Sequence, residues 1–419
     1  MALSAIGFRP AARALQIMRS LLPQGQAPSA NGGQFWLLRL GLYELKRPKE
    51  LADDWVWLID NTIQTGNGKC LLVVGVRLSQ WNAKRLAALE MDPEASFALA
   101  HQDLSVFNIE LMESSNGPAV EQHLEQLSQQ TGITPCAILS DQGPDVRPGA
   151  LRFSQAADRS TVVIHDIAHG VANALKRQLH QSPEWERFLA DANRSKTQIR
   201  QTPYAFLMPP ELKNKARWMN LQPLIDWSRR VQQFLRDPVA ALAKADAPRD
   251  LGMLEQKIGW LRRYGSSIDE WSSMLEAVGI TLKYIRHHGY HAQAHHDLTS
   301  LLGGFAEGPV AAMVAEVLEF VAAQSSLCGE RSLPGSTEVL ESLIGKGKQQ
   351  MGRNKNGYTK TVLAMAAAVV DVSKTAIETA LQTVKVHELR NWIHQKLGIS
   401  LQAQRQRALP ALGSGTKTG

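Results

Sequence analysis

The chain has 419 residues, which is enough for two or three domains or for one core with a large insert. Hydrophobic residues make up 44% of it, ample for a core, but the longest apolar run, VLAMAAAVV, is far too short to span a bilayer. Lys and Arg number 46 against 39 Asp and Glu. The resulting net charge of +7 suits a polyanionic partner such as DNA, although a generic basic protein would look the same.

The cysteines and the N-terminus indicate an intracellular protein. Cys70, Cys136 and Cys328 are odd in number, and the first two lie inside apolar runs, so we expect buried, reduced thiols. No CxxC pair occurs in the sequence, which argues against a zinc site. Arg9 and Pro10 interrupt the apolar residues that a secretion signal would need.

Residues 1–48 form a short basic region with helical spacing of apolar residues over 12–23 and 35–45. The run PQGQAPSANGG between them has the composition of a loop. Two interpretations fit: a partial helix-turn-helix that begins in its middle, or a simple N-terminal packing element.

Residues 49–180 change to a pattern of strands and helices. Three strands come first, with the turn TGNG between the first two, which predicts an antiparallel meander. Helix, strand, helix, strand and helix follow, and the near-continuous apolar fourth strand suits a position buried on both faces. This order is typical of a ribonuclease H-like core with a mixed five-stranded sheet, in which the first and fourth strands are neighbours. The expected strands are residues 53–60, 69–78, 103–112, 136–141 and 161–166, and the expected helices are residues 119–132, 146–157 and 167–179.

The rest of the chain predicts helices. Residues 181–332 hold no convincing strand and are expected to be an all-helical insertion rich in Trp and Arg. Residues 333–356 resume the core with its last helix, and residues 357–419 predict two or three more helices and a disordered tail, GSGTKTG. The predicted fold is therefore α/β, with a large helical insertion and helical N- and C-terminal appendages. The apolar periodicity places insertion helices at residues 223–235, 253–264, 267–285 and 309–326.

Three acidic residues are candidates for catalysis. Asp60 closes the apolar run WVWLID, Asp141 closes AILSD, and Glu341 lies on the last core helix. At adjacent strand ends with a helical glutamate, these carboxylates could hold two Mg²⁺ or Mn²⁺ ions, which can activate water or a 3′-hydroxyl against a phosphodiester. Taken singly, each aspartate is more simply a turn residue. Glu338 is the alternative glutamate, and Asp166 is the alternative second ligand, although an N-cap is its simpler role.

Basic side chains near these acids are candidates for DNA contacts. Lys348 lies two helical turns beyond Glu341, where a cation can meet a phosphate next to the metals, and Lys346 is close by. Both lysines could equally be solvated surface charges. His169, one turn into the helix after Asp166, could pair with that carboxylate or touch DNA.

The predicted insertion adds further candidates. Most of its tryptophans should be core, but Trp260 stands beside Arg262 and Arg263 and could stack on an unpaired base at a cut DNA end. Residues 287–296, HHGYHAQAHH, invite a zinc interpretation. The absence of cysteines and the single adjacent acid, Asp297, favour a solvent-facing or DNA-facing helix end or loop instead.

Several stretches resemble bacterial insertion-sequence transposases of the DDE class, over most of residues 35–410. STEVLES is similar to the TNxIES signature of Mutator-type transposases, in which the glutamate before Ser is catalytic, and this favours Glu341. The spacing from Glu341 to Lys348 is similar to the glutamate–lysine arrangement of cut-and-paste enzymes. The matching stretches are RLGLYELKRPKELADDWVWLIDNTIQTGNGKCLLVVGVRL, ILSDQGPDVRPG, HDIAH, GSTEVLESLIGKGK and QTVKVHELRNWIHQKLGISLQAQRQRAL.

The chain departs from this family at two places. Family members usually carry a longer N-terminal helix-turn-helix region that binds the terminal inverted repeats, so we expect an N-terminally truncated transposase. A histidine usually follows the first aspartate, and Asn61 stands here instead. That difference should alter a contact beside the metal ligands and not a ligand itself.

The resemblance implies metal-dependent hydrolysis and strand transfer at the ends of an insertion sequence. The partners would be the transposon ends and target DNA, with a homodimer joining two ends and no membrane. The location would be the bacterial cytoplasm, at the nucleoid. The alternatives are a ribonuclease H-like nuclease without strand transfer, and an inactive or domesticated transposase that binds DNA.

Overall fold

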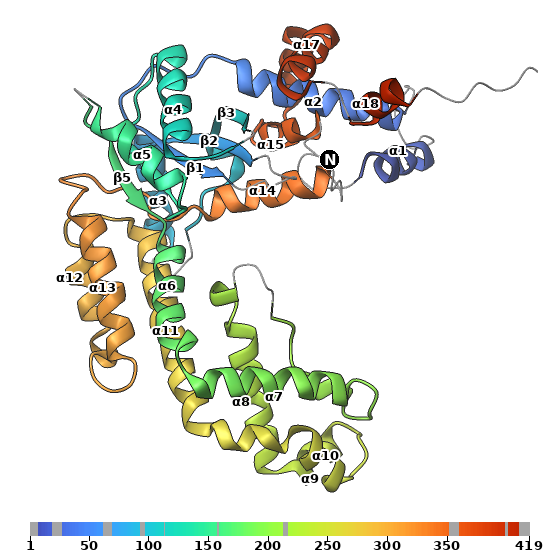
Figure 1. Cartoon of the computed structure of the whole chain (residues 1–419), viewed down its shortest axis with the longest axis vertical. Coiled ribbons are helices and arrows are strands. Elements are labelled where there is room, and N and C mark those ends of the chain that lie inside the picture. Colours follow the sequence, from blue (N-terminus) through green and yellow to red (C-terminus); the bar gives the residue numbers. More distant parts are fainter. Residues whose placement is uncertain are drawn as a thin grey trace, which may run out of the picture. The chain divides into compact units, whose positions relative to one another are not determined.

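A five-stranded sheet organises the first of two units into which the chain divides (Figure 1). The computed structural model describes residues 7–18, 27–61, 69–92, 97–112, 114–156, 159–212, 217–351, 360–398 and 401–409. Unit 1 combines Met1–Ile164 with Ser336–Gly419, and unit 2 is His165–Gly335. The second unit thus interrupts the first in the sequence.

The sheet has the strand order β3-β2-β1-β4-β5. β1 pairs antiparallel with β2, β2 pairs antiparallel with β3, and β1 pairs parallel with β4. The predicted mixed five-stranded sheet is confirmed, and so is the placement of the first and fourth strands as neighbours. The strands are β1 (Trp55–Asn61), β2 (Lys69–Arg77), β3 (Ser105–Met112), β4 (Ala137–Ser140) and β5 (Val162–His165).

Alternation of side chains gives β1 two different faces. Trp57 and Ile59 belong to a core that includes residues of α4 (Gly117–Thr131) and α5 (Val146–Gln155). Asp60 occupies the alternate position and therefore faces the opposite side of the sheet. The end of β1 thus presents a carboxylate on the face that α4 and α5 do not cover.

Helix α14 (Glu338–Met351) contacts β1 and is the predicted last core helix. In Figure 1 it runs below β1, whereas α4 stands above it. Helix α3 (Leu78–Met91), by contrast, was not predicted: it separates β2 from β3, where the sequence pattern suggested consecutive strands. Its buried side chains are Leu78 and Trp81, both in its first turn, so it lacks the apolar stripe that marks a helix in a sequence.

The N-terminal and C-terminal segments of unit 1 pack together. α2 (Ala30–Lys46) contacts α15 (Leu363–Ala367) so closely that a Cβ at Gly41 would lie 2.0 Å from the Leu363 carbonyl oxygen. α2 begins before the predicted residue 35 because Ser29 caps it, its Oγ accepting a hydrogen bond from Gly32 N at 3.0 Å. The predicted tail GSGTKTG lies outside the described residues. The other helices here are α1 (Phe8–Ile17), η7 (Lys360–Val362), α16 (Lys374–Thr383), α17 (Val386–Leu397) and α18 (Leu401–Ala408).

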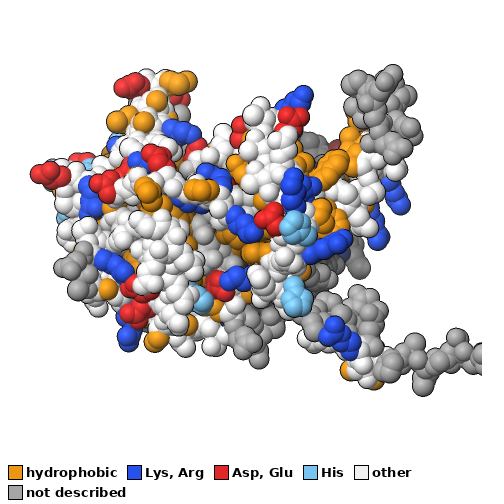
Figure 2. Space-filling model, turned by 90° about the horizontal axis from the view of Figure 1, so that it is seen from above, with side chains coloured by type: hydrophobic (Ala, Val, Ile, Leu, Met, Phe, Trp, Pro, Cys, Tyr) orange, Lys and Arg blue, Asp and Glu red, His pale blue; other side chains and the backbone are white. Residues whose placement is uncertain are grey.

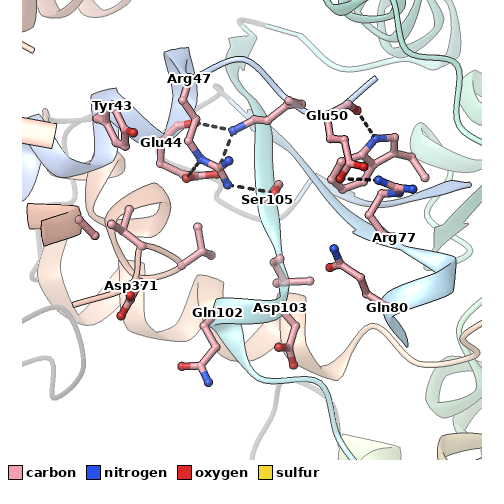
Figure 3. A pocket seen from close by; sticks show the side chains of 16 residues that line it. Tyr43, Glu44, Arg47, Glu50, Arg77, Gln80, Gln102, Asp103, Ser105 and Asp371 are labelled. Atoms are coloured by element: carbon pink, nitrogen blue, oxygen red, sulfur yellow. Dashed lines mark hydrogen bonds and ion pairs between the residues drawn. The ribbon is translucent and has the colours of Figure 1, made fainter. Parts of the chain in front are cut away.

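A buried carboxylate links α2 to the sheet. Glu44 is 2% exposed, and its Oε1 accepts hydrogen bonds from Lys49 Nζ at 2.9 Å and from the backbone N–H of Val106 at 3.1 Å. Arg47 donates to its other oxygen and to Ser105 Oγ, as Figure 3 shows beside a pocket of about 410 Å³. Burial lowers the pKa of Lys49 to about 8, and Glu44 opposes that shift.

The regular secondary structure of unit 2 is helical over its described residues, apart from His165 at the end of β5 and an isolated β-bridge between Tyr290 and Leu333. α6, which we expected in the catalytic core before residue 181, contacts α11 and α13 and belongs to this unit. The helices are α6 (Ile167–His180), α7 (Pro183–Ile199), α8 (Gln222–Arg236), α9 (Pro238–Lys244), α10 (Leu251–Ile258), α11 (Gly265–His288), α12 (Ala294–Leu301) and α13 (Ala311–Ser325), with 3-10 turns η3 (Ala205–Leu207), η4 (Arg217–Met219), η5 (Gly259–Tyr264) and η6 (Gly303–Phe305).

Aromatic side chains form the core at one end of unit 2. The Trp185 ring lies 5.5 Å from Phe188 and 4.8 Å from Trp271, measured between centroids. Phe188 in turn contacts Trp260 and Tyr264 at 5.9 and 5.4 Å. Such pairs add stability beyond the area they bury, which explains the tryptophan content of this segment.

Candidate active site

The strand register brings the two candidate aspartates next to each other. Ile59 of β1 pairs with Ser140 of β4, and the next residue in each chain segment is Asp60 or Asp141. Paired strands lie about 4.8 Å apart, so the two backbones are neighbours at this edge. Both aspartates are partly exposed. Two hard oxygen donors at one accessible strand edge are the ligands that Mg²⁺ favours.

The loop after β4 holds the Asp141 carboxylate in place. Its Oδ1 accepts a hydrogen bond from the backbone N–H of Gly143 at 3.0 Å. A Cβ added at Gly143 would lie 2.9 Å from the same oxygen, closer than Cβ atoms normally approach. The glycine therefore allows the close approach that orients this carboxylate.

If the candidate acids form a metal-dependent nuclease site, as the sequence predicts, we expect Gly143→Ala to reduce its DNA cleavage by about tenfold or more, because the added methyl group must displace the Asp141 carboxylate. Thermal unfolding should change little, since the clash is with the end of a partly exposed side chain. Gly279→Ala is the control, because nothing lies within 4 Å of a Cβ built at that helical position. Full activity of Gly143→Ala would show that the Asp141 carboxylate is not constrained by this loop.

Glu341 lies in the first turn of α14, the helix that contacts β1. Its backbone N–H donates to the carbonyl of the buried Thr337 at 3.0 Å, and its side chain is exposed. Glu338, the alternative glutamate, is the first residue of the helix and is partly exposed. Over the described residues, no group of three or more His, Cys, Asp or Glu converges closely enough to hold a metal ion. The structure places Asp60 and Asp141 each one residue beyond a register pair of neighbouring strands, and Glu341 on a helix that contacts β1.

A polar network that we did not predict fixes the end of β1 from its other face. Asn61 Nδ2 donates to Asp145 Oδ2 at 2.9 Å and to Ser115 Oγ, while Lys69 Nζ donates to Asp145 Oδ2 at 2.6 Å. Asp145 is 7% exposed and is also the N-cap of α5. Burial would raise the pKa of Asp145, but hydrogen bonds from Lys69 and Ser115 outweigh it and hold that pKa below its ordinary value. Asn61, the residue after Asp60, is therefore an anchor for the end of this strand.

The predicted DNA contacts of α14 differ in their surroundings. Lys346 Nζ lies 3.0 Å from His101 Nδ1, and His101 Nε2 lies 3.2 Å from Ser342 Oγ. Burial lowers the pKa of His101, and the charge of Lys346 lowers it further. A lysine ammonium can only donate, so His101 Nδ1 accepts its hydrogen bond. Lys348 is exposed in the last turn of the helix.

In unit 2, Asp166 caps α6. It is 1% exposed, and its Oδ2 accepts hydrogen bonds from both the backbone N–H and the ring Nδ1 of His169, each at 2.9 Å. The cap role that the sequence offered for Asp166 is thus present, together with the predicted pairing to His169. The alternative role of Asp166 as a metal ligand stays a prediction.

The other predicted DNA contacts of unit 2 already have partners. Trp260 is partly buried among Phe188, Trp227 and Tyr264, with its indole nitrogen enclosed by protein. Arg262 Nε lies 3.5 Å from Glu255 Oε2, and Arg263 Nη2 lies 2.9 Å from Asp191 Oδ2.

The histidine-rich segment of unit 2 is joined by hydrogen bonds. The Tyr284 hydroxyl donates to Asp297 Oδ2 at 2.5 Å and lies 3.0 Å from His291 Nε2. Tyr284 also stacks on the His288 ring at 4.6 Å. These contacts give the segment a structural explanation that needs no metal.

The comparisons with known proteins do not indicate what this site does. No protein-family model matches the chain, and no curated protein matches it either. Within the described part of the chain, we find no helix that combines the length and the apolarity required to cross a membrane.

Proposed function

We propose that the chain is a DDE-class DNA transposase, in which Asp60, Asp141 and Glu341 form the catalytic set. The observation that carries the proposal is the register of β1 and β4, which places Asp60 beside Asp141 while the helix of Glu341 contacts β1. The resemblance of the surrounding stretches to insertion-sequence transposases supports the same choice. A ribonuclease H-like core is the fold we propose for unit 1.

The donor set suits two Mg²⁺ or Mn²⁺ ions. Asp60 and Asp141 are adjacent, accessible carboxylates, and Glu341 is an exposed carboxylate on a helix that contacts their strand. When bound, such ions activate an attacking oxygen and stabilise the charge that develops on the phosphate. Asp60, Asp141 and Glu341 would hold them, with Glu338 or Asp166 as alternative ligands.

The remaining residues would orient the reactants. The Gly143 N–H fixes one oxygen of Asp141, and Asn61 ties the end of β1 to Asp145. Lys346 and Lys348 on α14 would bind phosphates of the DNA. Water first hydrolyses a phosphodiester at the element end, and the 3′-hydroxyl that is released then attacks a target phosphodiester in line. One P–O bond forms and one breaks in each step.

A strand-transfer assay tests this proposal. The purified chain is incubated with Mg²⁺ or Mn²⁺, a supercoiled target, and labelled DNA from the region flanking its coding sequence, supplied both intact and with a pre-cut 3′ end. Joined products from the pre-cut end support a transposase. Cleavage without joining indicates a ribonuclease H-like nuclease, and binding without either reaction indicates an inactive or domesticated protein. A transposase should also bring two labelled ends into one complex, as expected of a homodimer.

A further inference from the structure

Charge in unit 2 is divided sharply along the sequence. Residues 181–264 carry 15 Lys and Arg against nine Asp and Glu, whereas residues 265–335 carry three against eight. The first segment contains α7 to α10, which gather at one end of this unit in Figure 1. An excess of six positive charges in one helical segment is a strong attraction for a polyanion.

The arginines of α8 line a groove at this end of the unit. The groove has a volume of about 560 Å³, and all seven of its lining side chains are polar or charged. Arg229, Arg230 and Arg236 supply the cations, with two glutamines from the same helix, and Asp226 and Asp269 supply the acids. The apolar side of α8 is buried, which leaves this polar side facing outward.

The three arginines are available to bind an anion. Their hydrogen bonds go to neutral groups: Arg229 donates to Ser272 Oγ at 3.0 Å, and Arg230 donates to the Asp226 backbone oxygen at 3.2 Å. The Asp226 carboxylate instead accepts from Gln222 at 2.8 Å. Among the described residues, no ion pair involves these arginines, in contrast to Arg262 and Arg263. Figure 2 shows one face of the molecule, on which basic and acidic side chains are interspersed.

The groove has the chemistry of a phosphate-binding surface. A guanidinium donates two parallel hydrogen bonds to a phosphate, and Arg229 and Arg236, seven residues apart on one helix, lie about 10 Å apart along it. They can therefore reach different phosphates. The lining offers no aromatic ring for stacking on bases, and no apolar side chain for a lipid or a small hydrophobic ligand.

We propose that the α8 groove binds the phosphate backbone of duplex DNA without reading its sequence. The inference rests on the proposed function for the choice of DNA over another duplex polyanion. It needs neither the metal ions nor the acidic site, so it can be tested where no cleavage occurs.

The test measures binding of the full chain to a labelled random duplex in EDTA, by anisotropy at several salt concentrations. Each phosphate contact contributes about −0.9 to the slope of log K against log salt. Arg229→Gln with Arg236→Gln should therefore make the slope shallower by about 1.8 and weaken binding at low salt by at least about tenfold. The matched control is Arg177→Gln with Arg194→Gln, which removes the same formal charge from arginines already paired with Glu316 and Asp191 at 2.8 and 3.3 Å.

An unchanged slope in the α8 double variant overturns the inference. An equal loss of DNA affinity in both double variants also overturns it, because binding would then depend on the net charge of the chain and not on this groove. Loss of binding to anionic vesicles with DNA binding intact would assign the groove to lipid and also overturn it. Lost DNA binding in the α8 variant upholds the inference even if the wild-type chain performs no strand transfer. The experiment therefore distinguishes a groove that does not bind DNA from a chain that does not perform the proposed catalysis.

Discussion

Asp60→Asn and Asp141→Asn are each expected to reduce metal-dependent DNA cleavage by at least about 100-fold. Loss of a contact that merely orients a metal ligand already costs about 10–100-fold, and these changes remove a ligand charge. DNA binding in EDTA should be unchanged, because neither aspartate supplies a phosphate contact. Cleavage of labelled duplex with Mg²⁺, together with metal-free anisotropy, measures the two effects on the same preparation.

Asp53→Asn is the matched control for both variants. Asp53 is an exposed aspartate that precedes β1, so its loss changes the net charge by the same amount at the other end of the strand. Glu341→Ala should behave like the two aspartate variants, whereas Glu338→Ala should cleave normally. The reverse result would assign the third ligand to Glu338, and full activity of Asp60→Asn or Asp141→Asn would refute the proposed site.

The sheet could be predicted because its signal is local. The strands at residues 53–60 and 136–141 are short apolar runs, and each ends in an aspartate. Chain order and the preference for short connections then made them neighbours, as the register confirms. Helix α3 escaped prediction because an exposed helix with two buried side chains leaves no apolar periodicity to detect.

The contacts that support the candidate site could not be predicted from local patterns. Asp145 meets Lys69 and Asn61 across 76 and 84 residues of sequence, and nothing in the three local segments marks them as partners. Likewise, the pairing of Arg263 with Asp191 spans 72 residues, whereas within the described part of the chain no ion pair involves the arginines that line the α8 groove. Charge along the chain is visible in a sequence, but its neutralisation depends on tertiary contacts.

The sequence also did not show which unit α6 belongs to. Apolar periodicity predicted α6 correctly as a helix, but periodicity does not say which partner an apolar face meets. α6 contacts α11 and α13, which begin about 100 and about 145 residues after it, so it joins unit 2 and the boundary falls at His165.

Glu44→Gln is expected to destabilise unit 1 by about 3 kcal/mol, because it leaves a buried ammonium without its counter-charge. The side chains of Glu44 and Lys49 are each 3% exposed, and Arg47 adds a second cation next to them. A glutamine at position 44 can still accept the hydrogen bond from the Val106 N–H, so the loss of stability reports on the missing carboxylate charge. Hydrogen exchange of the β2 and β3 amides, which lie in unit 1, measures this loss of unfolding free energy. Glu378→Gln is the control, since its ion pair with Lys374 is exposed and should be worth well under 1 kcal/mol.

Two further results separate this explanation from a general packing defect. Adding Lys49→Met to Glu44→Gln should recover much of the lost stability, because the double variant buries neither charge. The deficit of Glu44→Gln should also shrink as the pH rises. The pKa of Lys49 is lowered by burial from 10.5 to about 8, so between those values the unfolded chain binds more protons and stability rises with pH. Without the Glu44 charge, the pKa of Lys49 falls further, so Lys49 in the folded variant loses its proton at a lower pH than in the wild-type chain. The stability of the variant therefore begins to rise at a lower pH, and its deficit relative to the wild type shrinks. A deficit that stays constant from pH 7 to pH 9.5 would show that the Lys49 charge is not its cause.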